Sequence, residues 1–369
     1  MLVTFVLGSV HSFSVFIAPL ETALDLTRSE ISLVYSLALV FITVAVLLGY
    51  RIYALIPAWQ LVGIACIVAA VGLMLAATAD SWWVLFMGYS LLFGLSNGLG
   101  YGFTLQLVGR ELPAIKGFAM GAVTAAYAVG SIVFAKVISF KISTVSIASA
   151  FTTLSLCLIA CAILSTTMLW MSRASYGPRY EPLDGVEPVL DSHRVLLFWA
   201  AYMFSVFSGL MAIGHAAGIA LSRGASLDQS VWAAMMIGIG SACGGFLVGW
   251  LIDRLPIRSF MTGLPLLSAA ALGLLVITGS PVTSIVLLCL VGFSYGAIIA
   301  IYPVAISNYF GNHGAKAYGR VFTAWGFAGL VAPWFAGLIY DIQTNYQLAL
   351  LVASLAAILS ALTVRIARL

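Results

Sequence analysis

The sequence predicts an all-α integral membrane protein whose twelve membrane-spanning helices form two six-helix bundles. Three observations lead to this fold class. The 369-residue chain is 63% apolar and 8% charged, whereas a soluble globular protein carries about 25% charged residues. Its apolar runs reach the roughly 20 residues that a helix needs to cross a bilayer. Several sequence features also recur about 200 residues apart, which indicates an internal duplication.

The same composition excludes other classes of protein. The apolar runs lack the alternation that a membrane β-barrel shows. The positive charges are scattered over loops, which does not favour a nucleic-acid-binding surface. No catalytic triad or metal-ligand spacing is present, so we expect no enzyme, cofactor or metal site. The cysteines all lie in apolar runs, where packing is their expected role: Cys66, Cys157, Cys161, Cys243 and Cys289.

Charged or proline-containing breaks divide the first half into six apolar runs. The breaks lie around Asp25, Pro57, Asp80, Pro113 and Lys141. The predicted helices are 2–23, 30–50, 57–78, 82–108, 115–140 and 145–172. Residues 19–21 offer no small-residue cleavage site, so we expect no cleaved signal peptide.

The second half is divided in the same way. Its breaks lie around Arg223, Pro256, Pro281, Lys316 and Asn345. The predicted helices are 195–222, 229–251, 258–278, 282–308, 318–340 and 345–366. Residues 173–194 are polar and contain three prolines, which is typical of a linker. We therefore predict one bundle at 1–172, a cytoplasmic linker at 173–194 and a second bundle at 195–369.

The distribution of basic residues predicts the orientation. If both termini and the linker are cytoplasmic, twelve basic residues lie inside: Arg51, Arg110, Lys116, Arg173, Arg179, Arg194, Arg254, Arg258, Lys316, Arg320, Arg365 and Arg368. Four lie outside: Arg28, Lys136, Lys141 and Arg223. Cytoplasmic loops are enriched in Lys and Arg, so we expect a multi-pass protein of the cytoplasmic membrane with both termini inside.

The densest charge cluster between two long apolar runs is Gly249–Arg258, with the sequence GWLIDRLPIR. It resembles the signature loop of the major facilitator superfamily of secondary transporters, which repeats in each half. The matching stretch in the first half is GYRIYALIPAW, in which Tyr53 stands where Asp253 stands. Four pairs share offsets of 198–202 residues: Gly49 and Gly249, Pro57 and Pro256, Gly94 and Gly292, Gly117 and Gly319.

The resemblance implies a gating role for this loop. In the family, the loop Asp docks at the cytoplasmic start of a helix in the other half and holds the inside closed. Carried over, Asp253 would dock at the helix that begins near Gly117, with Arg254, Arg258 and Gly249 supporting the contact. The corresponding contact in the first half is expected to be weak, because Tyr53 has no charge.

Polar residues at membrane depth are the candidates for a substrate site, since they are costly there unless they face protein or water. His11 and His215 lie on the first and seventh predicted helices, which line the central cavity in the resembling family. The fourth predicted helix carries Asn97 and Tyr101 on one face. The tenth carries Tyr295 and Tyr302, with Pro303 nearby. Further candidates are Tyr35 on the second predicted helix and Tyr127 on the fifth. Each residue has an alternative role in packing or in hydrogen bonding between helices.

A second resemblance concerns GSVHSFSVFIAPLE, SEISLVYSLAL and GRVFTAWGFAGLVAPWFAGLIYD, which begin at Gly8, Ser29 and Gly319. They look like the oxalate/formate antiporter and monocarboxylate carrier branch. Members of that branch carry an Arg in the eighth helix or a Lys in the eleventh. Here the eighth predicted helix has no cation, and Trp325 stands where the Lys is expected. Because its indole N–H can donate, Trp325 is also a candidate for the substrate site.

These observations predict a secondary active transporter that works by alternating access. The expected solute is a monocarboxylate or a related small organic acid, moved by symport or antiport with protons or a counter-solute, and the protein is expected to be a monomer in the bilayer. One alternative is an efflux carrier for amphipathic compounds, which a weakly charged aromatic cavity would also suit. Another is a non-transporting membrane receptor or scaffold on a transporter fold.

Overall fold

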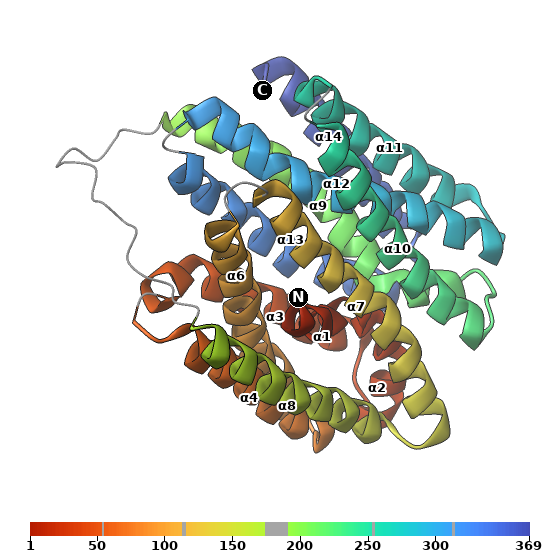
Figure 1. The fold of residues 1–369 in the computed structure, drawn as a ribbon. Coiled ribbons are helices and arrows are strands. Elements are labelled where there is room, and N and C mark those ends of the chain that lie inside the picture. Colours follow the sequence, from red (N-terminus) through yellow and green to blue (C-terminus); the bar gives the residue numbers. More distant parts are fainter. Residues whose placement is uncertain (54, 113–115, 174–190, 253–254, 312–313) are drawn as a thin grey trace.

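A computed structural model describes residues 1–53, 55–112, 116–173, 191–252, 255–311 and 314–369. The described part is helical throughout and forms two groups of helices, one from each half of the sequence (Figure 1). Eleven helices there are long and apolar enough to cross a membrane, and a bent pair at the start makes a twelfth. The predicted all-α membrane fold is confirmed.

The described part of the first half contains ten elements. They are α1 (Leu2–Leu7), the 3₁₀ segment η1 (Gly8–Val15), α2 (Ile17–Leu24), α3 (Arg28–Tyr53), α4 (Ala58–Ala77), α5 (Trp82–Leu85), the π-helical segment η2 (Phe86–Phe93), α6 (Gly94–Glu111), α7 (Lys116–Thr144) and α8 (Ile147–Ser172), with η1 continuing the first span and η2 the fourth.

The second half contains six long helices. They are α9 (Ser192–Leu221), α10 (Leu227–Leu251), α11 (Ile257–Ile277), α12 (Pro281–Phe310), α13 (Gly314–Gln343) and α14 (Gln347–Ala367).

The first span differs from the continuous helix predicted at 2–23. Its two parts, Leu2–Val15 and Ile17–Leu24, meet at an angle of 63°. Pro19 explains the break, because a proline inside a helix removes one hydrogen bond and clashes with the carbonyl four residues earlier, here that of Val15. The preceding η1 segment has 3₁₀ geometry, which is frequent near helix breaks and functional hinges. His11 lies in this 3₁₀ segment, just before the bend.

Two seams join the bundles, one between α3 and α13 and the other between α7 and α10. Along the first seam, glycines of α13 allow backbone contact. A Cβ atom added to Gly337 would lie 2.7 Å from Ser32 Oγ, and one added to Gly329 would lie 2.9 Å from Leu39 Cβ. This close packing lies toward the end that contains Arg28, which we call the Arg28 end.

The opposite end contains the termini of α8 and α9 that the linker joins, and we call it the linker end. Here the helices of the seams are not crowded. A Cβ atom added to Gly121 of α7, Gly249 of α10 or Gly319 of α13 would meet no described atom within 4 Å. The bundles are therefore in contact toward the Arg28 end and separated around these glycines.

Candidate functional site

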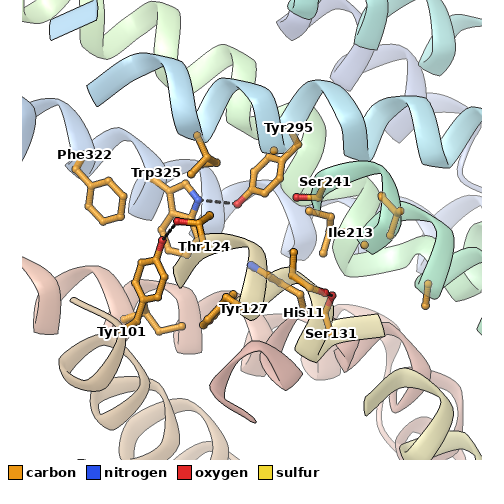
Figure 2. Close-up of a pocket in the computed structure, with 17 residues that line it drawn as sticks. His11, Tyr101, Thr124, Tyr127, Ser131, Ile213, Ser241, Tyr295, Phe322 and Trp325 are labelled. Carbon is orange, nitrogen blue, oxygen red and sulfur yellow. Dashed lines mark hydrogen bonds between the residues drawn. The ribbon is translucent and has the colours of Figure 1, made fainter. Parts of the chain in front are cut away.

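A cavity lies between the two bundles near the middle of the helices (Figure 2). Its volume is about 80 Å³. At roughly 10–15 Å³ for each water molecule, it has room for about five to eight waters, or a solute with a similar number of non-hydrogen atoms. The residues that line it are His11, Ile42, Tyr101, Thr124, Tyr127, Ala128, Ser131, Ile213, Ala234, Ile237, Gly238, Ser241, Tyr295, Gly296, Ile299, Phe322 and Trp325.

His11 reaches this cavity from the 3₁₀ segment η1. Its Nδ1 lies 2.9 Å from the hydroxyl of Tyr35, and the Tyr35 ring stacks on Phe13 at 5.4 Å. Its Nε2 has no hydrogen-bond partner among the described residues. The imidazole lies edge-on to Tyr127 of its own bundle at 5.6 Å and to Tyr295 of the other bundle at 6.4 Å. His11 is thus held at one nitrogen and available to a solute at the other.

Tyr127 is oriented by a chain of hydrogen bonds behind the cavity wall. The buried Asn97 donates through Nδ2 to the Leu7 carbonyl at 2.8 Å, at the junction of α1 and η1. Its Oδ1 accepts from the Tyr127 hydroxyl at 3.0 Å. The Tyr127 proton is therefore occupied, and its oxygen offers the cavity acceptor capacity. Asn97 positions the first span and Tyr127 without lining the cavity.

Tyr295 is oriented from the second bundle. Trp325 Nε1, which can only donate, lies 2.8 Å from the Tyr295 hydroxyl oxygen. Figure 2 shows this bond between the two side chains. The Tyr295 oxygen therefore accepts, and its own O–H is left to donate. Trp325 also stacks on Phe322 at 5.7 Å. Trp325, which stands where a Lys was expected, therefore orients the Tyr295 hydroxyl as a donor and supplies no charge itself.

Tyr101 and Thr124 form a second polar pair on the first-bundle side of the cavity. Thr124 Oγ1 donates to the Met120 carbonyl at 3.2 Å, and the Tyr101 hydroxyl lies 3.4 Å from Thr124 Oγ1. Because the Thr124 proton is taken up by its own helix, Tyr101 donates in this contact. The pair leaves acceptor oxygens toward the cavity.

Four of the seven substrate-site residues predicted from the sequence line the cavity: His11, Tyr101, Tyr295 and Trp325. Tyr302 does not, because its buried ring packs on Tyr202 at 4.6 Å inside the second bundle. His215 is fully buried toward the Arg28 end, where it contacts Tyr346 and Pro333. Asn97 lies behind the wall, as described above.

The predicted gating residues are only partly within the described chain. Asp253 and Arg254 lie outside the described residues. Arg258 is exposed and donates to the Arg365 carbonyl near the end of α14 at 3.0 Å, where a cation is favoured by the helix dipole. Gly249 faces open space. Tyr53 is buried against Phe103 at 5.3 Å, so it fills space between α3 and α6.

Sequence reasoning gave Tyr127 of α7 only as a further candidate and missed the other polar residues of α7 and α10. Thr124, Tyr127 and Ser131 follow one another at intervals of three and four residues, which places them on one face of α7. Ser241 lies on α10 after Gly238 and contributes from the second bundle. The polar periodicity of α7 was the available signal.

The described residues that line the cavity include no Lys, Arg, Asp or Glu. Among the described residues, no three His, Cys, Asp or Glu side chains gather as a metal ion would require. Among the described lining residues, the donors without a partner are the Tyr295 O–H, the Ser241 hydroxyl and, when it carries a proton, His11 Nε2. A solute carboxylate between them would bridge both bundles.

Comparisons with known proteins agree with this architecture. The chain superimposes on the inward open conformation of the xylose transporter XylE from E. coli with a TM-score of 0.78, covering 99% of this chain and 93% of that one at 14% identity. Its partially occluded inward open conformation gives a TM-score of 0.74. These likenesses establish the fold alone.

Sequence comparisons add the family. The family described as Major Facilitator Superfamily matches residues 195–368. Residues 195–368, which contain the second bundle, therefore belong to this superfamily. The chain is 26% identical to the MFS-type transporter YhjX of Escherichia coli over 335 residues, 87% of this chain and 82% of YhjX. It is also similar to monocarboxylate transporter 12 of Rattus norvegicus, at 25% identity over 340 residues, 82% of this chain and 70% of the relative.

Proposed function

We propose that this superfamily member transports a small monocarboxylate, or a related small organic acid, by alternating access of the central cavity. The observation that carries the proposal is the opposition of His11 and Tyr295 across the cavity, one from each bundle. A carboxylate bound to both would draw the bundles together, and its departure would release them. The predicted units 1–172 and 195–369 would move as the two bodies.

The chemistry of the lining favours transport of the acid together with a proton. A carboxylate enters a low-dielectric site only with a partner charge or several donors. Among the described lining residues, His11 is the one histidine, a side chain that becomes a cation by taking up a proton. When it is protonated, both of its nitrogens donate, Nδ1 to Tyr35 and Nε2 to the solute. Anion and proton then travel as a neutral pair.

Several findings support the proposed class of solute and an inward-facing state. The relatives include a protein named as a monocarboxylate transporter. The packed Arg28 end and the uncrowded linker end agree with an inward-facing state if the linker end is cytoplasmic, as the basic residues predict. The fold neighbours are inward open conformations of a transporter.

Export of amphipathic compounds is the second candidate. The rings of Tyr101, Tyr127, Tyr295, Phe322 and Trp325 give the cavity an aromatic lining that would suit such molecules. The volume of about 80 Å³ favours the small acid. An amphipathic drug-sized molecule needs a pocket of roughly 300 Å³ or more.

An uptake screen in proteoliposomes tests the proposal. Purified protein would be offered labelled monocarboxylates of two to four carbons, labelled xylose and lipophilic dyes. Saturable uptake of a small acid, competed by other small acids and not by xylose, is expected. Dye export without acid uptake would replace the proposal by the second candidate. If the protein shows neither acid uptake nor dye export, a receptor or scaffold would be favoured.

A further inference from the structure

The Arg28 end carries a polar network that the cavity does not use. It begins at the first turn of α3, where a helix leaves four backbone N–H groups without partners in the helix. Thr27 and Glu30 form a capping box within the first bundle. Glu30 Oε2 accepts from the Thr27 N–H at 2.9 Å, and Thr27 Oγ1 accepts from the Glu30 N–H at 3.3 Å. The N–H groups of Arg28 and Ser29 receive no hydrogen-bond acceptor from this box.

Asp341 of the second bundle accepts from both remaining groups. Its Oδ1 lies 3.0 Å from the Arg28 backbone nitrogen, and its Oδ2 lies 2.9 Å from that of Ser29. A carboxylate is favoured at a helix N-terminus by the partial positive charge there and by charge-assisted hydrogen bonds. The start of α3 is therefore fully capped only while α13 lies against it.

The Arg28 side chain joins the same two bundles. Its guanidinium donates to both Glu21 oxygens of its own bundle at 2.6 Å. It also donates through Nη1 to the Tyr346 hydroxyl at 2.9 Å and lies 3.7 Å over the centre of the Tyr340 ring. Arg28 is 9% exposed. Because Glu21 is in the first bundle, the charge stays paired if the bundles separate.

The network continues from Tyr346 into the core of the second bundle. His215 Nε2 lies 2.7 Å from the Pro333 carbonyl, which can only accept, so Nε2 carries the proton. His215 Nδ1 is then an acceptor and receives the Tyr346 O–H at 3.1 Å. The bonds run in one direction, from Arg28 through Tyr346 to His215. His215, which the sequence predicted to bind solute, thus orients the Tyr346 hydroxyl, and this hydroxyl accepts the hydrogen bond from Arg28.

We infer that Asp341, Arg28, Tyr346 and His215 form an outer latch that holds the inward-facing state. Opening at the Arg28 end would expose the Arg28 and Ser29 N–H groups to water and separate Arg28 from Tyr346. The Thr27–Glu30 box and the Arg28–Glu21 pair would persist, since each lies within one bundle. The latch rests on alternating access and does not depend on which solute is carried.

Spin-label distances between the bundles test the latch without any substrate. One label pair, Val145→Cys with Ile277→Cys, reports the Arg28 end, and a second pair, Leu112→Cys with Leu255→Cys, reports the linker end. These positions are exposed. The background lacks the five native cysteines. In Asp341→Ala the ratio of open to closed distances at the Arg28 end is expected to rise roughly five- to thirty-fold, with the linker end closing in parallel.

Two variants provide matched controls. Thr27→Ala weakens the capping box within the first bundle, so it should lower the unfolding temperature without shifting the ratio. Asp80→Ala removes an exposed carboxylate that contacts only Ser81 among the described residues, and should change neither quantity. If Asp341→Ala does not fold, Asp341→Asn, which keeps the shape but not the charge, should shift the ratio in the same direction. An unchanged ratio in the folded Asp341 variant, equal to that of Asp80→Ala, would overturn the latch.

Discussion

At the scale of single residues, the cavity separates donors from acceptors. Asn97 occupies the Tyr127 proton, so that Tyr127 can accept, and Trp325 occupies the Tyr295 lone pair, so that Tyr295 can donate. Neither orienting contact carries a charge. Under the proposed function, solute recognition would depend on these oriented hydroxyls and on the protonation of His11.

The Tyr295 hydroxyl gives the first prediction. Tyr295→Phe keeps the ring and removes the donor aimed at the solute. A hydrogen bond to a charged group is worth about 1.5–3 kcal/mol, so KM for the small acid should rise roughly ten- to hundred-fold. The measurement is initial uptake against solute concentration in proteoliposomes. Tyr302→Phe makes the same chemical change outside the cavity and should leave KM unchanged. Equal effects of the two variants would contradict the assignment.

The residue scale also shows where sequence reasoning stops. His11, Tyr101 and Tyr295 were chosen because polar residues at membrane depth have few roles, and Trp325 was chosen through the family resemblance; all four line the cavity. His215 satisfied the same criterion, yet its ring turns toward Tyr346 and Pro333. Depth in the membrane can be read from the sequence, whereas the direction of a side chain depends on the packing of neighbouring helices.

At the scale of helices, the surroundings of the glycines indicate which helix surfaces lie close together. The glycines of α13 near the Arg28 end face backbone and side chains of α3, whereas Gly249 and Gly319 face open space at the linker end. Small residues let membrane helices approach closely. We expect the glycines of the linker end to be brought into contact when the carrier turns outward.

Gly249 therefore gives the second prediction. Gly249→Phe fills space that no described residue occupies in this state, and it should obstruct closure of the linker end. Transport should fall more than tenfold, while the amount of folded protein in the membrane stays nearly unchanged. Gly263→Phe, at an exposed glycine of α11 that also faces open space, is the control and should transport normally. Normal transport by Gly249→Phe would mean that α10 takes no part in closure.

The helix boundaries illustrate a second limit of the sequence. Charged and proline-containing breaks located the long helices closely, because a membrane helix ends where polar residues begin. The bend in the first span was not predicted, since its apolar run continues through Phe16 and Pro19. A proline near a helix end can be accommodated or can bend the helix, and only the packing against α3 and α7 decides.

At the scale of the whole molecule, the fold followed from composition and duplication. A chain with 8% charged residues must span a membrane with helices, and the repeated loop indicated two related bundles. The sequence contained the linker-end loop with Asp253, which lies outside the described residues. The sequence pattern did not indicate the outer latch, because its partners Arg28 and Asp341 are 313 residues apart in the chain.

The orientation of the molecule gives the third prediction. If twelve basic residues lie inside, then tags inserted at Gly185 in the linker and at Leu369 should both be protected in intact cells. The measurement is labelling by a membrane-impermeant reagent before and after permeabilisation. A tag at Val145, at the Arg28 end, should be labelled in both conditions. Labelling of either cytoplasmic tag in intact cells would reverse the orientation and, with it, the inward-facing assignment.

The central claim is that a small acid and a proton share the cavity at His11. The most direct test is uptake of the labelled acid into proteoliposomes under an imposed pH gradient, acid outside, with and without a membrane potential. The account predicts accumulation that follows the pH gradient, is indifferent to the potential, and falls at least tenfold in His11→Ala but not in His193→Ala, which alters an exposed histidine of α9. Accumulation driven by the potential alone, or undiminished in His11→Ala, would contradict it.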